Sequence, residues 1–215
     1  MTSRLTGALL LVAVAGLVSG CAALGPVAVQ GDIGAGDRVQ SGCEQGEAVT
    51  ISEGPAEVVT WGQPPLPPLG RLGAAVSRAE ASKAGYVPPD PAMPDGMKAQ
   101  LYLLGDDGLY SFYSAEPVRE DDRIDAFLKE HGVVVAMTRR EGSDVADVVK
   151  STIGDRATGV MVGGHSAAMN RGDPFANGVR PFNIMWSSDA YDWRVMSGLE
   201  TATASLDVAR SIACG

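Results

Sequence analysis

A hairpin pattern at residues 101–113 is the strongest secondary-structure signal in the chain. Its sequence is Leu101-Tyr102-Leu103-Leu104, then Gly105-Asp106-Asp107-Gly108, then Leu109-Tyr110-Ser111-Phe112-Tyr113. The four residues between the two apolar runs are glycines and aspartates, which tolerate the positive φ angles of tight turns. The first run is apolar on both faces, which indicates a central strand of a sheet.

Downstream of this hairpin, helical and strand patterns follow one another without an internal repeat. Apolar positions recur at helical spacing in three segments and as short runs in the others. In chain order, the pattern predicts a helix over about 120–131 ended by Gly132, a strand at 133–137, a helix from Ser143 to Gly154, a strand at 159–162, a hairpin of 181–186 and 191–196, and a last helix that opens with Ser197 and Glu200 at capping-box spacing.

Upstream, the chain is rich in proline. Nine of its 13 prolines fall between Pro55 and Pro94, so residues 62–97 are expected to form mostly extended loop, interrupted by one helix at about 71–83. Two short strands are expected at 48–51 and 57–60. Paired strands together with alternating helices predict an α+β fold for residues 41–215, a mainly antiparallel sheet with about four helices packed on one face.

The first 21 residues have the order of a secretory signal. A short basic start ending at Arg4 precedes the apolar run Leu5–Leu17, and Val18-Ser19-Gly20-Cys21 follows. This tetrapeptide resembles the lipobox of bacterial lipoproteins, in which an aliphatic residue, a small residue and Gly or Ala precede the cysteine that is acylated. The resemblance implies cleavage after Gly20.

The resemblance also implies a cellular location and a membrane anchor. Residues 1–20 would be a signal peptide, Cys21 would carry the lipid (palmitate among its acyl chains), and the glycine-rich residues 21–40 would form a flexible tether. The folded part would then lie outside the cytoplasm, held to the membrane by lipid. The alternative is an uncleaved transmembrane anchor, since no charged side chain occurs from Leu5 to Gly31.

If Cys21 carries lipid, Cys43 and Cys214 remain as an even pair. An extracytoplasmic compartment permits a disulfide between them. Closing a loop of roughly 170 residues would stabilise the fold by about 4–5 kcal/mol in the chain-entropy model. The alternative is two unpaired buried thiols.

Charge narrows the choice of partners. The net charge is −9, and without Arg4 the mature part carries 16 basic and 26 acidic residues. Such a surface repels phosphate backbones, so nucleic-acid binding is not expected. The partners expected are the membrane, through the lipid anchor, and either another envelope protein or a small ligand.

One segment suggests catalysis. Residues 160–168 run from an apolar strand into Gly164-His165-Ser166, which resembles the G-x-S-x-G nucleophile elbow of α/β-hydrolases with Ser166 as nucleophile. Ala168 replaces the last glycine, and no histidine follows His165 to act as base. A triad would have to use the upstream His131. The alternative places Ser166 on a continuing strand, with the glycines permitting close packing.

Other candidate sites are fewer. The two histidines lie 34 positions apart, so neither a metal site nor a cofactor is expected. Trp186, Tyr191 and Trp193 cluster around the second hairpin and could line a ligand surface, or else pack into the core. The sequence therefore favours a non-enzymatic binding or interaction domain of unknown ligand, with a serine hydrolase of envelope substrates as the alternative.

Overall fold

The computed structural model describes residues 67–94, 96–140, 142–153 and 156–215. The signal peptide, Cys21, the tether, Cys43 and the strands expected at 48–51 and 57–60 lie outside the described residues. Nothing in the structure therefore bears on those predictions.

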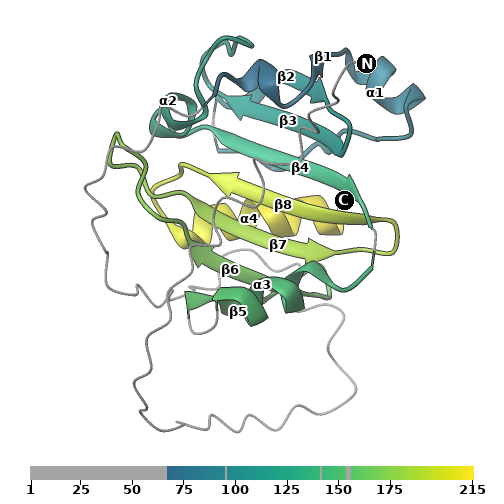
Figure 1. Ribbon diagram of the computed structural model, residues 1–215, viewed down its shortest axis with the longest axis vertical. Helices are drawn as coiled ribbons and strands as arrows, with labels where there is room; N and C mark the ends of the chain where they lie inside the picture. Colours follow the sequence, from purple (N-terminus) through teal and green to yellow (C-terminus); the bar gives the residue numbers. More distant parts are fainter. Residues whose placement is uncertain (1–66, 95, 141, 154–155) are drawn as a thin grey trace, which may run out of the picture. The chain divides into compact units, whose positions relative to one another are not determined.

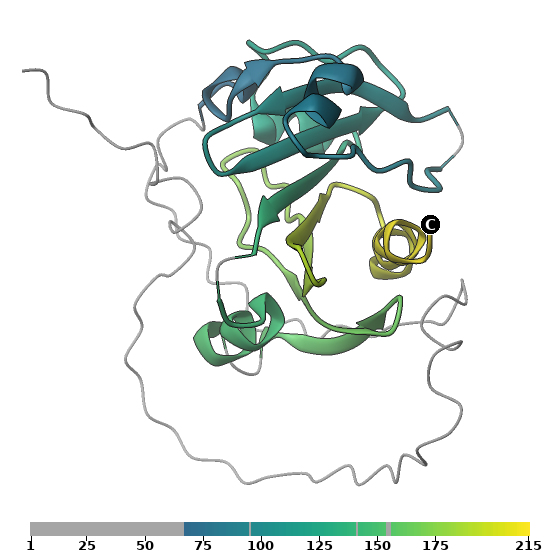
Figure 2. The ribbon, with the colours of Figure 1, turned by 90° about the vertical axis from the view of Figure 1, so that its right-hand side faces the viewer.

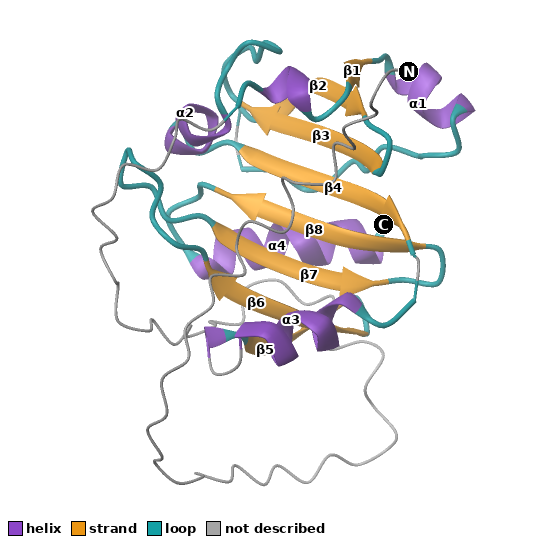
Figure 3. Ribbon diagram, viewed as in Figure 1, coloured by secondary structure: helices purple, strands orange, loops and turns teal. Residues whose placement is uncertain are grey.

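The described residues form one eight-stranded antiparallel sheet with the strand order β1-β2-β3-β4-β8-β7-β6-β5 (Figures 1 and 3). The strands are β1 (Ala74–Ala75), β2 (Lys98–Leu104), β3 (Gly108–Ser114), β4 (Val133–Arg139), β5 (Thr158–Val162), β6 (His165–Arg171), β7 (Phe182–Ser187) and β8 (Tyr191–Ser197). The helices are α1 (Arg78–Lys83), α2 (Ile124–Lys129), α3 (Val145–Ile153) and α4 (Ala202–Cys214), with a 3-10 turn at Leu69–Arg71. The α+β class and the antiparallel sheet are confirmed.

The hairpin predicted at 101–113 is formed by β2 and β3, with Leu104 paired to Leu109. Its glycines are required for a different reason than expected. A Cβ on Gly105 would lie 2.3 Å from the carbonyl oxygen of Leu72, and one on Gly108 would lie 2.4 Å from that of Met137. Close backbone approach, rather than a positive φ, therefore excludes side chains here.

The helices cover both faces of the sheet, so their packing on one face is not confirmed. Helix α4 lies against β7, β8 and β5 on what we call the back face, and α3 lies against β6 and β7 on the opposite, front face (Figures 1 and 2). The reason is visible in β3, which is buried at every position, and in β4, which is buried at its first five. Strands buried on both sides need cover on both sides.

The buried residues that the structure describes form three clusters, and the two larger ones lie on opposite faces of the sheet. On the back face, α4 packs on alternate residues of the central strands, including Val135, Ile184, Trp186 and Val195. On the front face, Phe127 and Leu128 of α2 pack with Phe112, Val134 and Leu103. None of the helices in the described part of the chain is both long and apolar enough to span a bilayer.

Two helix starts differ from the sequence prediction. The side chain of Asp144, not Ser143, accepts a hydrogen bond from the Ala146 amide at the start of α3, at 2.9 Å. Thr201, not Ser197, caps α4 by accepting from the Ala204 amide. Ser197 still belongs to β8, where pairing with Val133 and Phe182 keeps it in the sheet.

Candidate functional site

Ser166 lies in the first half of β6, not on a strand-to-helix elbow. Val162 of β5 pairs with His165, and the two residues between them, Gly163 and Gly164, have φ angles of 56° and 82°. This is a two-residue hairpin turn of the kind that needs glycine. Ser166 is therefore on a continuing strand, where its exposed hydroxyl accepts a hydrogen bond from the Lys150 ammonium at 3.3 Å.

His131 is remote from Ser166. It follows α2 and precedes β4, whose first residue Val133 lies level with Ser197, Phe182 and Arg171 on successive strands. Ser166 is five residues away along β6 and three strands across, which corresponds to roughly 20 Å. The His131 ring contacts the Gly198 carbonyl, with Nδ1 at 3.2 Å. The structure therefore does not bring together the pair that a His131–Ser166 triad would need.

The aromatic candidates belong to the back-face core. Trp186 is 1% exposed, and its ring stacks on Trp193 with centroids 5.8 Å apart and planes 5° apart. The indole N–H of Trp193 donates to the Ser188 hydroxyl, and the Tyr191 hydroxyl donates to the Gly85 carbonyl. These groups are satisfied within the protein, as the core alternative expects.

Cys214 is the last residue of α4. Its pairing with Cys43 stays a prediction.

The front face carries a polar cluster that the sequence patterns did not single out. It consists of Arg194 on β8, Asn183 on β7 and Asn170 on β6, which we call the Arg194 cluster. Asn183 pairs in register with Asn170, and Arg194 lies diagonally across from Asn183 on the next strand. The guanidinium donates from Nη2 to Oδ1 of Asn183 at 2.8 Å. The three side chains thus occupy neighbouring positions on one face.

Around this cluster the face is mostly apolar. Arg194 lies beside Ala136 and Met185 on its two neighbouring strands, and Asn183 lies beside Met196. Asn183 and Asn170 are 5% and 8% exposed. Arg194 is half-buried, but its Nε is fully buried. The cluster is therefore a small group of polar side chains at the edge of an apolar core.

The charge of Arg194 is not compensated by a carboxylate. No acidic side chain in the described segments forms an ion pair with it. Its Nε has no hydrogen-bond partner there, and neither has Oδ1 of Asn170. Burial lowers the pKa of Arg194 to about 10, which still leaves it charged at neutral pH.

Tyr110 lies on the far side of Ala136 from Arg194. Its hydroxyl donates to Oδ2 of Asp107 at 2.7 Å. Burial raises the pKa of Tyr110, and the bond to Asp107 raises it further, while the nearby charge of Arg194 opposes this shift. Tyr110 therefore remains a neutral hydroxyl, already used as a donor to Asp107.

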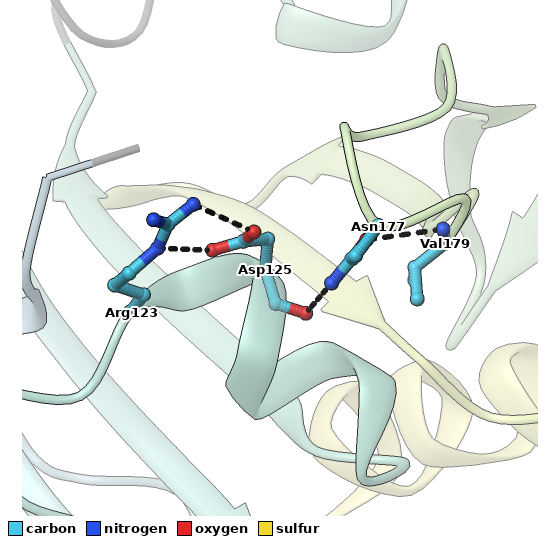
Figure 4. A network of polar contacts seen from close by, with 4 residues as sticks. All are labelled: Arg123, Asp125, Asn177 and Val179. Carbon is cyan, nitrogen blue, oxygen red and sulfur yellow. Dashed lines mark hydrogen bonds and ion pairs between the residues drawn. The ribbon is translucent and has the colours of Figure 1, made fainter. Parts of the chain in front are cut away.

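The loop at 172–181 closes one side of the face. Asn177 donates to the backbone carbonyl of Asp125 in α2 at 2.7 Å and accepts from the Val179 amide at 3.1 Å (Figure 4). The Asp125 carboxylate is held by Arg123 through two bonds of 3.0 and 2.9 Å. Phe175 and Val179 pack on the front-face core. The loop between β6 and β7 is thus fastened to α2.

A signal for Arg194 is present in the sequence but is ambiguous. In Tyr191-Asp192-Trp193-Arg194-Val195-Met196 a charged residue alternates with apolar ones, as on any strand with a solvated face. Only the pairing order places Arg194 between Ala136 and Met185. No group of three or more potential metal-ligating side chains occurs in the segments that the structure covers.

Comparison with known protein families, with curated proteins and with solved structures finds no match for this chain.

Proposed function

We propose that this chain is a bacterial lipoprotein, exported, acylated on Cys21 and held on the outer side of a membrane, and that its folded domain acts by binding. The observation that supports export and lipid anchoring is the sequence Val18-Ser19-Gly20-Cys21 directly after an apolar run of 13 residues. A cysteine carrying two or three acyl chains anchors stably, because each buried methylene contributes about 0.8 kcal/mol.

The Arg194 cluster supports a binding role for the domain. A half-buried guanidinium without a counter-ion costs stability, since a charge loses hydration on burial. Charged groups whose pKa is perturbed by burial are concentrated at functional sites. The ligand would be either a small molecule or a group on another envelope protein.

The anchor is tested with Cys21→Ala. Wild-type protein is expected to enter the detergent phase and to show a mature N-terminus at residue 21 with added acyl mass. The variant is expected to stay in the aqueous phase or to accumulate as the uncleaved precursor. A wild-type chain that begins elsewhere, or lacks acyl mass, contradicts the proposal.

The proposed Cys43–Cys214 disulfide has a separate test. Mass spectrometry of the exported protein without reductant should recover one peptide pair that contains both residues. Free thiols at both positions would contradict the pairing and leave the anchor untouched.

The Lys150–Ser166 contact supports a second candidate, a serine hydrolase of envelope substrates. A lysine can serve as the base for a serine nucleophile in place of histidine. Lys150 reaches Ser166 from α3, and its side chain crosses over Gly159 of β5, where a Cβ would come within 3.7 Å of it. The chemistry would require the Lys150 ammonium to lose its proton and the serine to be presented to substrate.

A fluorophosphonate probe separates this candidate from a binding role. An enzyme is labelled on Ser166, and both Ser166→Ala and Lys150→Met abolish labelling. Ser211→Ala is a control, because that hydroxyl donates to the Val208 carbonyl within α4. Absence of labelling in the wild type rejects the hydrolase.

A further inference from the structure

We propose that the Arg194 cluster binds an oxyanion, a carboxylate or phosphate group of a small ligand, on the front face of the sheet. This inference deepens the proposed binding function and rests on it.

The guanidinium has donors left to offer. Of its five N–H groups, the structure uses one Nη2 hydrogen in the bond to Asn183, while Nε has no acceptor in the described part of the chain. Planar guanidinium groups bind carboxylate and phosphate through two parallel hydrogen bonds. Arg194 therefore presents the chemistry of an oxyanion receptor, and no carboxylate of the described segments fills it.

Asn183 holds this receptor in place. Its Oδ1 accepts from Nη2 and carries no formal charge, so it orients the guanidinium without neutralising it. An aspartate at this position would orient it equally well and would supply a permanent counter-ion. The presence of an amide, not a carboxylate, leaves the positive charge for another partner.

Asn170 extends the receptor onto β6. It is 8% exposed, and its Oδ1 has no partner among the described residues. The two ends of an asparagine amide exchange by rotation, so the same side chain can turn Nδ2 toward a bound anion. Arg194 and Asn170 would then donate from the two sides of Asn183.

The position of the cluster allows access. Arg194 is only half-buried, and the ribbon of β8 on this face is not crossed by any of the four helices (Figure 1). Helix α2 with its fastened loop lies toward one end of the strands, and α3 lies over β6 and β7. A small anion can therefore approach the exposed part of the Arg194 side chain.

Nitrogen-15 NMR of the full-length mature chain in neutral detergent tests the proposal directly. The Nε–H cross-peak of Arg194 is assigned by its loss in Arg194→Lys. Sodium acetate and inorganic phosphate are titrated in separate arms against sodium chloride at equal ionic strength. We expect a saturable shift of this cross-peak in at least one arm, and the arm that responds identifies the anion as carboxylate or phosphate.

Two variants sharpen the test. Asn183→Asp retains the hydrogen bond to Nη2 and adds a negative charge beside the guanidinium. This carboxylate competes with the bound anion, so the affinity for the anion should fall roughly tenfold to a hundredfold, as if the anion lost one hydrogen bond to a charged group. Arg194→Lys keeps the positive charge but lacks the planar guanidinium group, so it should bind the anion more weakly than wild type. Isothermal titration calorimetry measures both affinities.

The proposal is overturned if neither acetate nor phosphate moves the cross-peak beyond the chloride control, or if Asn183→Asp binds as tightly as wild type. Detergent partitioning of the same preparation reports the lipid anchor independently. Failure of anion binding with intact partitioning therefore rejects the site and leaves the anchored lipoprotein standing.

Discussion

The β7–β8 hairpin has two faces with opposite character. On the back face, Trp186, Trp193 and Val195 pack beneath α4, with the two indole rings stacked. On the front face, the intervening residues include Asn183 and Arg194, which form a polar cluster. The same two strands thus contribute to an apolar core on one side and, on the other, to a charge that has no ion-pair partner among the described residues.

This contrast distinguishes residues that stabilise the fold from residues that destabilise it. The stacked indoles bury large apolar areas, and the indole N–H of Trp193 donates to the nearby Ser188 hydroxyl. Arg194 loses hydration without gaining an ion pair in the described structure. A side chain that is expensive for the free protein is a better candidate for ligand binding than one that stabilises it.

The largest expected effect is on the back face. Trp186→Ala removes a side chain that is 1% exposed and leaves a cavity beside Trp193, so it should lower the free energy of unfolding by about 3–5 kcal/mol. Urea denaturation measures this. Met185→Ala, the next residue on the same strand but on the half-buried front face, is the matched control and should cost clearly less. Equal losses would mean that the two faces do not differ as described.

The second effect tests how firmly the front face is built. Asp125→Ala removes both bonds from Arg123, and it should lower the free energy of unfolding by about 1–2 kcal/mol because Arg123 can still turn to water. Amide exchange in loop 172–181 should stay unchanged, because Asn177 donates to the backbone carbonyl of Asp125, which alanine retains. Asp121→Ala, at an exposed position nearby, should change neither quantity.

Arg194→Met should have the opposite sign. The guanidinium of Arg194 is half-buried and has no ion-pair partner among the described residues. Replacing it by an apolar side chain beside Ala136 and Met185 should raise the free energy of unfolding by about 1 kcal/mol. Urea denaturation without added anion measures the change, and Lys98→Met at an exposed end of β2 is the control. A lower free energy of unfolding in Arg194→Met would show that Arg194 stabilises the fold.

The back face could be anticipated from the sequence, and the front-face cluster could not. Apolar alternation in Phe182–Trp186 and in the last helix predicts which side chains are buried, because periodicity records burial directly. The β2–β3 and β7–β8 hairpins were also predicted, whereas the β5–β6 hairpin was not. The placement of helices on both faces was missed because a run such as Val133–Met137 shows that both sides are covered without showing by what.

The Arg194 cluster depends on contacts between distant segments. Asn170, Asn183 and Arg194 come from three strands, and each is an ordinary polar residue in its own window. The same holds for Lys150 and Ser166, which meet only because α3 returns over β6. His131 was considered as the base for Ser166 because it is the only histidine besides His165. The register places it three strands from Ser166 and at the other end of the strands.

The smallest expected effect is a pH dependence confined to Arg194. Its pKa is lowered to about 10 by burial, so above that pH the folded wild type releases a proton that the unfolded chain still holds. The folded state then binds fewer protons, and a rise in pH stabilises wild type relative to Arg194→Met. The advantage of the variant should be constant from pH 7 to 9 and should then shrink progressively as the pH rises from 10 to 11. Tyr113, whose pKa is raised by burial, destabilises both proteins equally over this range and cancels in the difference. Burial also raises the pKa of Tyr110, and because the variant lacks the opposing charge of Arg194, Tyr110 narrows the gap in the same direction. Parallel urea titrations at each pH measure that difference. A gap that stays constant through pH 11 would mean that burial does not penalise the charge of Arg194, and the contrast between the two faces would then rest on packing alone.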